Sequence, residues 1–209
     1  MPESRLVFPI GPIGPIVPIV QAGVPVLRGR AAPVPPGEIG TPPMRELVAA
    51  MIATMRAAPG VGLAAPQIGI PLRIIVVEDP ADRLAALAPE DLRERERVPF
   101  PARALFNPVL VPVGEDRATF FEGCLSVDGF VALVERFRDV EVNALDENAE
   151  PVTLALRGWP ARILQHEVDH LDGTLYVDRM LTRSFATVAC AQEHFAGKSI
   201  ADVRELLGV

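Results

Sequence analysis

Cysteine, positive charge and long apolar runs are all scarce in this chain. Two cysteines among 209 residues cannot build a disulfide framework, so we expect free or metal-bound thiols in a reducing compartment. The formal net charge of −7 argues against a nucleic-acid-binding face, which would be basic, and no specific DNA partner is expected. The apolar stretch at residues 6–20 is too short to span a bilayer and holds four prolines, so no membrane partner is expected.

The composition predicts one domain behind a proline-rich start. With 49% hydrophobic residues, a chain of this length can bury a substantial core. The first 43 residues hold 11 of the 22 prolines. A signal peptide is an alternative, because Arg5 precedes the apolar stretch and Val20-Gln21-Ala22 is similar to a cleavage site, but the prolines weaken the apolar region. A transit peptide fits poorly, because hydroxyl side chains are few and Glu3 comes early.

Three helices are predicted from their ends and their apolar spacing. Thr41 followed by Pro42 is typical of a helix start, and apolar residues at helical spacing continue to about residue 58. A second helix should begin at Pro160 and end at Gly173. Ser199 should cap a third helix. The residues of this last helix that we expect to face inward are Ile200, Val203 and Leu206.

Short apolar or alternating segments predict the strands. They lie at residues 73–77, 107–113, 118–121, 131–134, 139–144 and 152–156, with a turn at 146–148. The run of mixed charges at 90–97 predicts a solvated helix or loop. Because the strands precede the second helix in a block, without strict βαβ alternation, the predicted fold class is α+β.

The pattern His-Glu-x-x-His at residues 166–170 indicates a metal site. On a helix, His166 and His170 share a face and can bind one ion, while Glu167 lies beside a metal-bound water as a general base. The alternative is a surface helix with incidental histidines. The chain has three histidines and two of them are here, which favours the metal site.

A catalytic metal usually takes a third protein ligand and leaves one position open. Cys124 follows Gly123, and the small glycine lets the backbone approach an ion closely, but a buried structural thiol is an equal alternative. Cys190 stands in an apolar stretch and is expected in the core. His194 is expected at the surface or in packing.

Small residues gather at 60–67, the segment GVGLAAPQ. They would let another chain approach the backbone closely. A phosphate loop is an alternative, but the glycine spacing differs, no strand precedes and no lysine follows. Gln67 could hold a carbonyl oxygen through its amide, or could be an ordinary surface amide.

These segments together resemble the peptide deformylases. The family pattern is G-x-G-x-A-A-x-Q, then E-G-C-x-S, then Q-H-E-x-D-H-x-x-G, and here the same order is GVGLAAPQ from Gly60, EGCLS from Glu122 and QHEVDHLDG from Gln165. The resemblance covers about residues 17–185. It is closest to the branch found in plant and animal mitochondria and in some bacteria, through FFEGCLSVDGF, GWPARILQHEVDHLDG and YVDRM.

The resemblance implies a role for each matching residue. It implies antiparallel sheets packed around a central His-Glu-x-x-His helix. The metal ligands would be Cys124, His166 and His170. The catalytic acid/base would be Glu167, and the oxyanion donors would be Gln67 and the N–H of Leu125. The residues that contact the substrate would be Val61, Gly62, Gly123 and Trp159, the last at the mouth of the methionine pocket.

The resemblance also implies the reaction and its setting. The family removes the formyl group from the N-terminal formylmethionine of new polypeptides and releases formate, with Fe(II) as the native metal and zinc, nickel or cobalt as replacements. The partners would be N-formylmethionyl nascent chains at the ribosome exit, and the location cytoplasmic, with an organelle address left open. Residues 1–16 would be a proline-rich extension and 17–209 a single catalytic domain, because 17–34 matches the family's first strand and turn.

One residue departs from the family pattern. The family usually has an arginine where this chain has Val131, which affects the expected grip on the peptide and leaves the metal chemistry intact. Arg136 matches a separate family arginine, and Arg138 could compensate for Val131.

Two other functions compete: a zinc endopeptidase with His194 as ligand, and a deformylase-like binding protein without activity.

Overall fold

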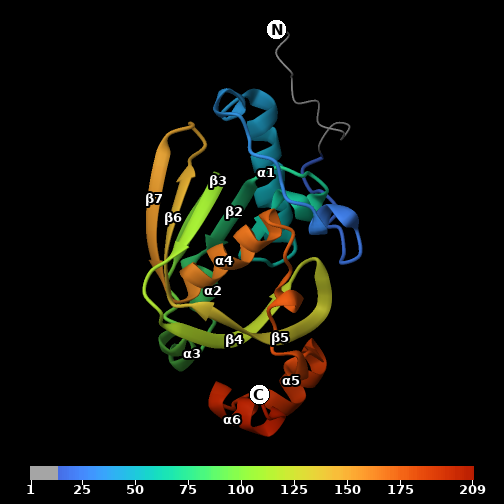
Figure 1. Cartoon of the computed structure of the whole chain (residues 1–209), viewed down its shortest axis with the longest axis vertical. Coiled ribbons are helices and arrows are strands. Elements are labelled where there is room, and N and C mark those ends of the chain that lie inside the picture. The colour runs from blue at the N-terminus through green and yellow to red at the C-terminus, as the bar shows by residue number, and fades with distance from the viewer. Residues whose placement is uncertain (1–13) are drawn as a thin grey trace.

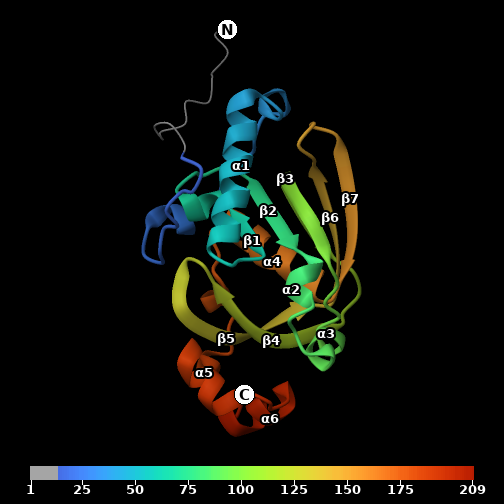
Figure 2. The same ribbon diagram turned by 180° about the vertical axis from the view of Figure 1, so that it is seen from behind.

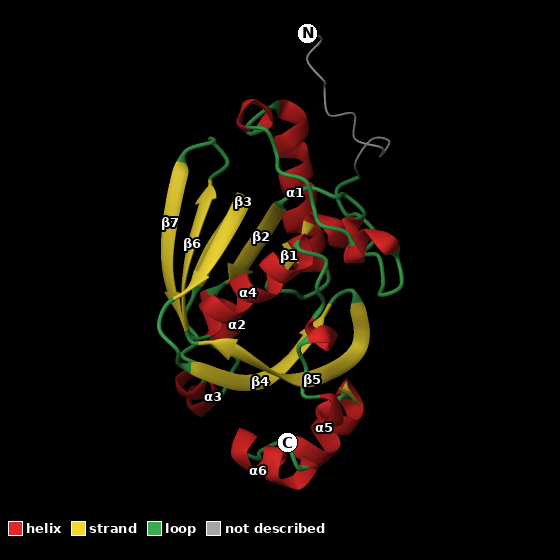
Figure 3. Ribbon diagram, in the orientation of Figure 1, coloured by secondary structure: helices red, strands yellow, loops and turns green. Residues whose placement is uncertain are grey.

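The computed structural model describes residues 14–209, so most of the expected proline-rich extension lies outside the described residues. Antiparallel strands form two sheets with a helix between them, which confirms the α+β class (Figure 3). The helices are α1 (Pro42–Ala57), α2 (Ala81–Leu84), α3 (Pro89–Glu94), α4 (Trp159–Leu171), α5 (Val188–Phe195) and α6 (Ile200–Leu207). The strands are β1 (Gly62–Ala64), β2 (Ile74–Asp79), β3 (Phe100–Pro112), β4 (Arg117–Cys124), β5 (Val127–Phe137), β6 (Asp139–Leu145), β7 (Pro151–Arg157) and β8 (Ala186–Thr187). None of these described helices is both long and apolar enough to cross a membrane.

Each of the two sheets ends in an edge strand near α4. The larger sheet has the order β1-β2-β3-β6-β7, and the smaller one the order β4-β5-β8. Helix α4 contacts strands of both sheets, and Figures 1 and 2 show it between them. Strands β1 and β4 are therefore edge strands that flank the central helix.

Strand β2 explains how the larger sheet is held. Its run of apolar residues is buried on both faces, as expected for a central strand. Ile74 and Val76 pack in the cluster that includes α1, whereas Ile75 and Val77 pack in the cluster that includes α4. Because successive side chains point to opposite faces, one short strand joins both cores.

Helix α1 begins where the sequence predicts, after Thr41. The Thr41 hydroxyl does not cap the helix; it donates to the Glu38 carbonyl at 2.7 Å, and a proline fills the first helical position instead. Leu47, Met51 and Met55 are fully buried, which confirms the predicted apolar stripe.

The segment 17–34 is not the strand that the resemblance implies. It runs as coil with a 3₁₀ turn at Pro25–Arg28 and one isolated bridge, between Ala32 and Leu72. Its prolines lack an N–H donor and cannot sustain a ladder of hydrogen bonds. Separate bonds attach it instead, for example from Val20 N–H to the Gln67 carbonyl at 2.8 Å.

The C-terminal end differs from the prediction in one residue. Ser199 caps α6 as predicted, with its hydroxyl oxygen accepting from the Asp202 N–H, and Val203 is buried. Leu206, expected to face inward, is 63% exposed. Helix α6 lies at the end of the molecule and packs against the 3₁₀ turn Thr182–Ser184, so only a narrow face is covered.

Candidate metal centre and active site

Helix α4 is fixed in the interior by its two ends. Gly158 precedes it with φ of 65°, and a Cβ there would lie 2.8 Å from the Glu96 carbonyl oxygen, so only glycine fits. Gly173 follows it with φ of 76°. Between these ends the helix is buried on most sides, and His166 and His170 project from one face.

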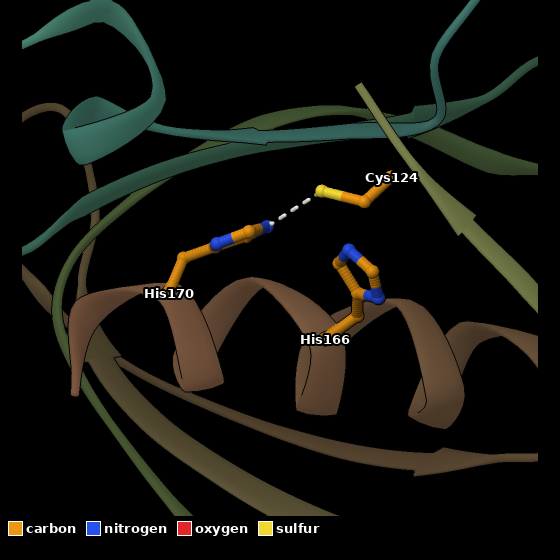
Figure 4. A group of neighbouring side chains, drawn as sticks. All are labelled: Cys124, His166 and His170. Atoms are coloured by element: carbon orange, nitrogen blue, oxygen red, sulfur yellow. Dashed lines mark hydrogen bonds between the residues drawn. The ribbon is translucent and has the colours of Figure 1, made fainter. Parts of the chain in front are cut away.

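Strand β4 ends at Cys124, directly opposite this face. The donor atoms of Cys124, His166 and His170 all lie within 4.8 Å of one another, and Sγ of Cys124 is 3.3 Å from Nε2 of His170 (Figure 4). Around a tetrahedral ion with ordinary bond lengths, such donors would be about 3.3–3.6 Å apart. One thiolate and two imidazoles at these distances therefore fit a single divalent metal ion.

Glu122 orients one of the histidines. Nδ1 of His166 donates to Glu122 Oε2 at 3.0 Å, which leaves the Nε2 lone pair for a metal. Arg136 donates two hydrogen bonds to the same carboxylate, and Arg162 donates one at 2.6 Å. Burial alone would raise the pKa of Glu122, but the charge of Arg136 and the bond from His166 hold it well below its usual range. The carboxylate is therefore ionised, and Nδ1 of His166 must be the donor.

Glu167 lies between the metal-capable residues and strand β1. It is 4% exposed, its Oε2 has no hydrogen-bond partner among the described residues, and burial raises its pKa to about 7. It packs directly against Gly62, where any Cβ would lie 2.6 Å from Glu167 Cδ. A carboxylate with this pKa can both accept and return a proton near neutral pH.

Gln67 is held with its amide nitrogen toward Cys124. The N–H of Ala64 donates to Gln67 Oε1 at 2.8 Å, which fixes the amide orientation. Gln67 Nε2 is then 3.6 Å from Cys124 Sγ and 3.3 Å from the Ser126 hydroxyl. The side chain is 1% exposed, so it is a buried, positioned donor and not the surface amide of the alternative.

These residues lie at a cavity of about 530 Å³. All the residues for which the sequence predicts a role line it, except His170, which is buried behind the others. Val61 and Gly62 line one wall at the edge of β1, and Gly123 lines the other at the edge of β4. Trp159 also lines the cavity, under the guanidinium groups of Arg95 and Arg97. The backbone groups of both edge strands thus border the same space.

Three expectations from the sequence prove wrong or lose support. Cys190 is exposed and not part of the core, because α5 packs on the outside of the smaller sheet. His194 is exposed on α5 as expected, and the metal-capable group found among residues 14–209 does not include it, so the endopeptidase alternative lacks its third ligand. Arg138 does not compensate for Val131: it pairs with Glu96 at 2.9 Å and does not line the cavity.

Buried charges lie behind the histidines, and the sequence alone did not predict this network. Asp169, inside the His-Glu-x-x-His segment, accepts from Arg136 at 2.5 Å and from Arg179 at 2.7 Å. Together with Glu122 and Arg162 these groups form one network beneath the site. The signal in the sequence was the presence of Glu122, Asp169 and Arg136 in segments expected to be buried, because buried charges must be paired.

Comparison with known proteins agrees with this geometry. The family described as polypeptide deformylase matches residues 16–185. Peptide deformylase 1A, chloroplastic, of Solanum lycopersicum is 51% identical over 169 residues, which are 81% of this chain and 61% of that protein. Peptide deformylase 1 of Streptomyces coelicolor is 51% identical over 175 residues, 83% of this chain and 78% of that protein. The Met-Ala-Ser-bound class I type b peptide deformylase from Acinetobacter baumannii has a TM-score of 0.70 and 37% identity, covering 79% of this chain and 98% of that one.

The chain belongs to the peptide deformylase family. It spans about three fifths of the length of the Solanum relative. The higher identity to the plant relative than to the class I type b structure agrees with the branch that the motifs indicate.

Proposed function

We propose that this chain hydrolyses the formamide bond of N-terminal formylmethionine on newly made polypeptides and releases formate. The observation that carries the proposal is that Cys124, His166 and Glu167 line one cavity between two strand edges, with the His170 donor atom within 4.8 Å of those of Cys124 and His166. Membership of the deformylase family selects this reaction among those open to a metal hydrolase. The related Acinetobacter structure holds Met-Ala-Ser, a peptide with the free N-terminal methionine that the reaction would leave.

Cys124, His166 and His170 are proposed as the ligands of one divalent ion. When bound, the ion would lower the pKa of a water molecule toward neutrality and place positive charge beside the formyl oxygen. Thiolate and imidazole suit iron and zinc. Fe(II) is proposed as the native ion, with Zn(II), Ni(II) or Co(II) able to replace it.

Glu167 is proposed to move the protons. As water adds to the formyl carbon, its carboxylate takes a proton from that water. When the carbon–nitrogen bond breaks, it delivers the proton to the leaving amine, so water and the formamide become formic acid and a free amine, which at neutral pH are formate and an ammonium group. Its buried position and a pKa of about 7 support both steps.

Gln67 and Leu125 are proposed to stabilise the negative charge that develops on the formyl oxygen. Gln67 Nε2 is a preorganised donor beside Cys124, because Ala64 fixes the other end of its amide. The N–H of Leu125 belongs to the residue that follows Cys124 on the cavity wall. Two donors fixed before the reaction need little reorganisation as charge develops.

The substrate backbone is proposed to pair with both strand edges. Val61 and Gly62 would bind one side of an extended peptide and Gly123 the other, as in β-strand addition. Trp159 would line the pocket for the methionine side chain. Main-chain bonds would supply affinity for any sequence, while the side-chain pocket would select methionine.

The remaining parts of the proposal concern the whole protein. Residues 17–209 would form a single catalytic domain and residues 1–16 an extension. The substrates would be N-formylmethionyl chains near the ribosome exit, and the location would be the cytoplasm. The Solanum relative is named as chloroplastic, which makes an organelle the alternative to test.

The decisive test is formate release from formyl-Met-Ala-Ser by protein loaded anaerobically with Fe(II). We expect turnover in the wild type, loss of at least about 10²-fold in Glu167→Gln with the metal retained, and no change in Glu205→Gln, an exposed carboxylate on α6. Near wild-type turnover in Glu167→Gln would refute the role of Glu167. No turnover in a metal-loaded wild type would favour the inactive binding protein, and Val131→Arg would then be the next variant.

A further inference from the structure

The chain continues beyond the family match, and this continuation reaches the cavity. The match ends at residue 185, and β8, α5 and α6 follow. Strand β8 adds to the outer edge of β5, with Val131 opposite Ala186 and Phe130 opposite Thr187. The next residue, Val188, lines the cavity together with Phe130 and Val131. A segment outside the family pattern therefore supplies part of the wall.

The position of Val188 is held firmly. It is the first residue of α5, whose N-terminus is capped by the Thr187 hydroxyl accepting from the Cys190 N–H. At the other end of α5, Phe195 stacks on Phe121 of β4 with ring centroids 5.7 Å apart. Figures 1 and 2 both show α5 against the β4–β5 hairpin. The helix is thus fixed to the same strands that carry Cys124.

The part of this wall formed by Phe130, Val131 and Val188 is apolar and open, and Asp128 lines the cavity beside it. Phe130 and Val188 are each 38% exposed, and Phe185 is 42% exposed. The rings of Phe130 and Phe185 stack with centroids 4.9 Å apart. Val131 lines the same part of the cavity and adds a further uncharged, apolar side chain. Exposed apolar side chains gathered at a cavity mouth indicate a binding surface.

We propose that Val188 and Phe130 form an apolar subsite for a side chain that follows the formylmethionine. The occupant is the substrate polypeptide itself, because the patch is continuous with the cavity proposed to bind that substrate. The inference rests on the proposed function. The guanidinium of Arg83, which also lines the cavity, is already engaged, since it donates to the Gly60 carbonyl at 2.7 Å.

The test compares peptides that differ in one side chain. Two series, formyl-Met-X-Ser and formyl-Met-Ala-X, carry leucine or aspartate at X. In at least one series the wild type should favour leucine by roughly tenfold in kcat/KM, mainly through KM. Val188→Lys should abolish or reverse this ratio. Leu206→Lys is the matched control, because Leu206 lies in the same C-terminal segment, is 63% exposed and does not line the cavity.

The outcomes separate the subsite from the reaction. Formyl-methionine amide lacks the following residue, so wild type and Val188→Lys should cleave it equally if only the subsite is changed. An unchanged leucine-to-aspartate ratio in Val188→Lys in both series overturns the inference, even if every peptide is cleaved. If no peptide is cleaved, the proposed function fails. The subsite can then still be tested by measuring the binding of Met-Leu-Ser and Met-Asp-Ser through the fluorescence of Trp159, the single tryptophan. Equal binding of the two would refute it.

Discussion

Replacing Gly62 by alanine should disable the site while leaving the fold in place. A Cβ at this position would lie 2.6 Å from Cδ and 2.7 Å from Cγ of Glu167 and would also collide with its Oε1. Ordinary contacts between carbon atoms are about 3.5–4.0 Å, so the carboxylate must retreat by about 1 Å. A displacement of about 1 Å in a reacting group costs on the order of 10²-fold in rate. We therefore expect kcat to fall about 10²-fold.

The loss of stability should not be large enough to unfold the protein. Overpacking of this kind costs about 1–3 kcal/mol, and Gly62 lies in an edge strand, so the variant should fold. The assay pairs formate release with metal content and urea unfolding. Gly37→Ala is the control for the glycine-to-alanine change itself, because its Cβ would meet nothing within 4 Å. A Gly62→Ala protein that binds metal and keeps more than half of the wild-type kcat would show that the position of Glu167 is not critical.

Three further predictions concern the buried charge network, the backbone beside Cys124 and the metal. Glu122→Gln removes the charge that neutralises the buried Arg136 and Arg162, so the free energy of unfolding should fall by about 3–5 kcal/mol in urea denaturation; a change below 1 kcal/mol would contradict the network. Gln21→Ala removes the amide that donates to the Leu125 carbonyl at 2.9 Å and so helps to hold the backbone of this proposed oxyanion donor. We expect kcat/KM to fall by up to about tenfold, and an increase in kcat/KM would contradict this role of the contact. Chelation should abolish formate release and a divalent ion should restore it; activity that survives complete metal removal would rule out the metal assignment.

The sequence predicts elements and ligands well wherever the signal is local. The spacing of His166 and His170 is set by one helical turn, and the run at 73–77 reports a strand buried on both faces. Caps and prolines place the starts of α1, α4 and α6 because they act on the nearest backbone groups.

What the sequence does not predict depends on contacts between distant residues. Strand β3 begins at Phe100, well before the predicted 107, because pairing with β2 overrides the prolines and charges of that stretch. Glu122 forms hydrogen bonds with Arg136 and Arg162, which are 14 and 40 residues away in the sequence, and no sequence periodicity indicates such contacts. The expected core position of Cys190 failed for a similar reason: an apolar stretch does not say which helix lies on the outside.

The cavity between the edges of β1 and β4 has a consequence for timing. A peptide that pairs with both edges must be extended over its first residues and stripped of other partners. An amino terminus already docked in a folded domain cannot enter without local unfolding. Under the proposed function, deformylation therefore competes with folding of the substrate: slow-folding chains offer a long interval for processing, whereas a chain that buries its first residues early must be processed before that burial.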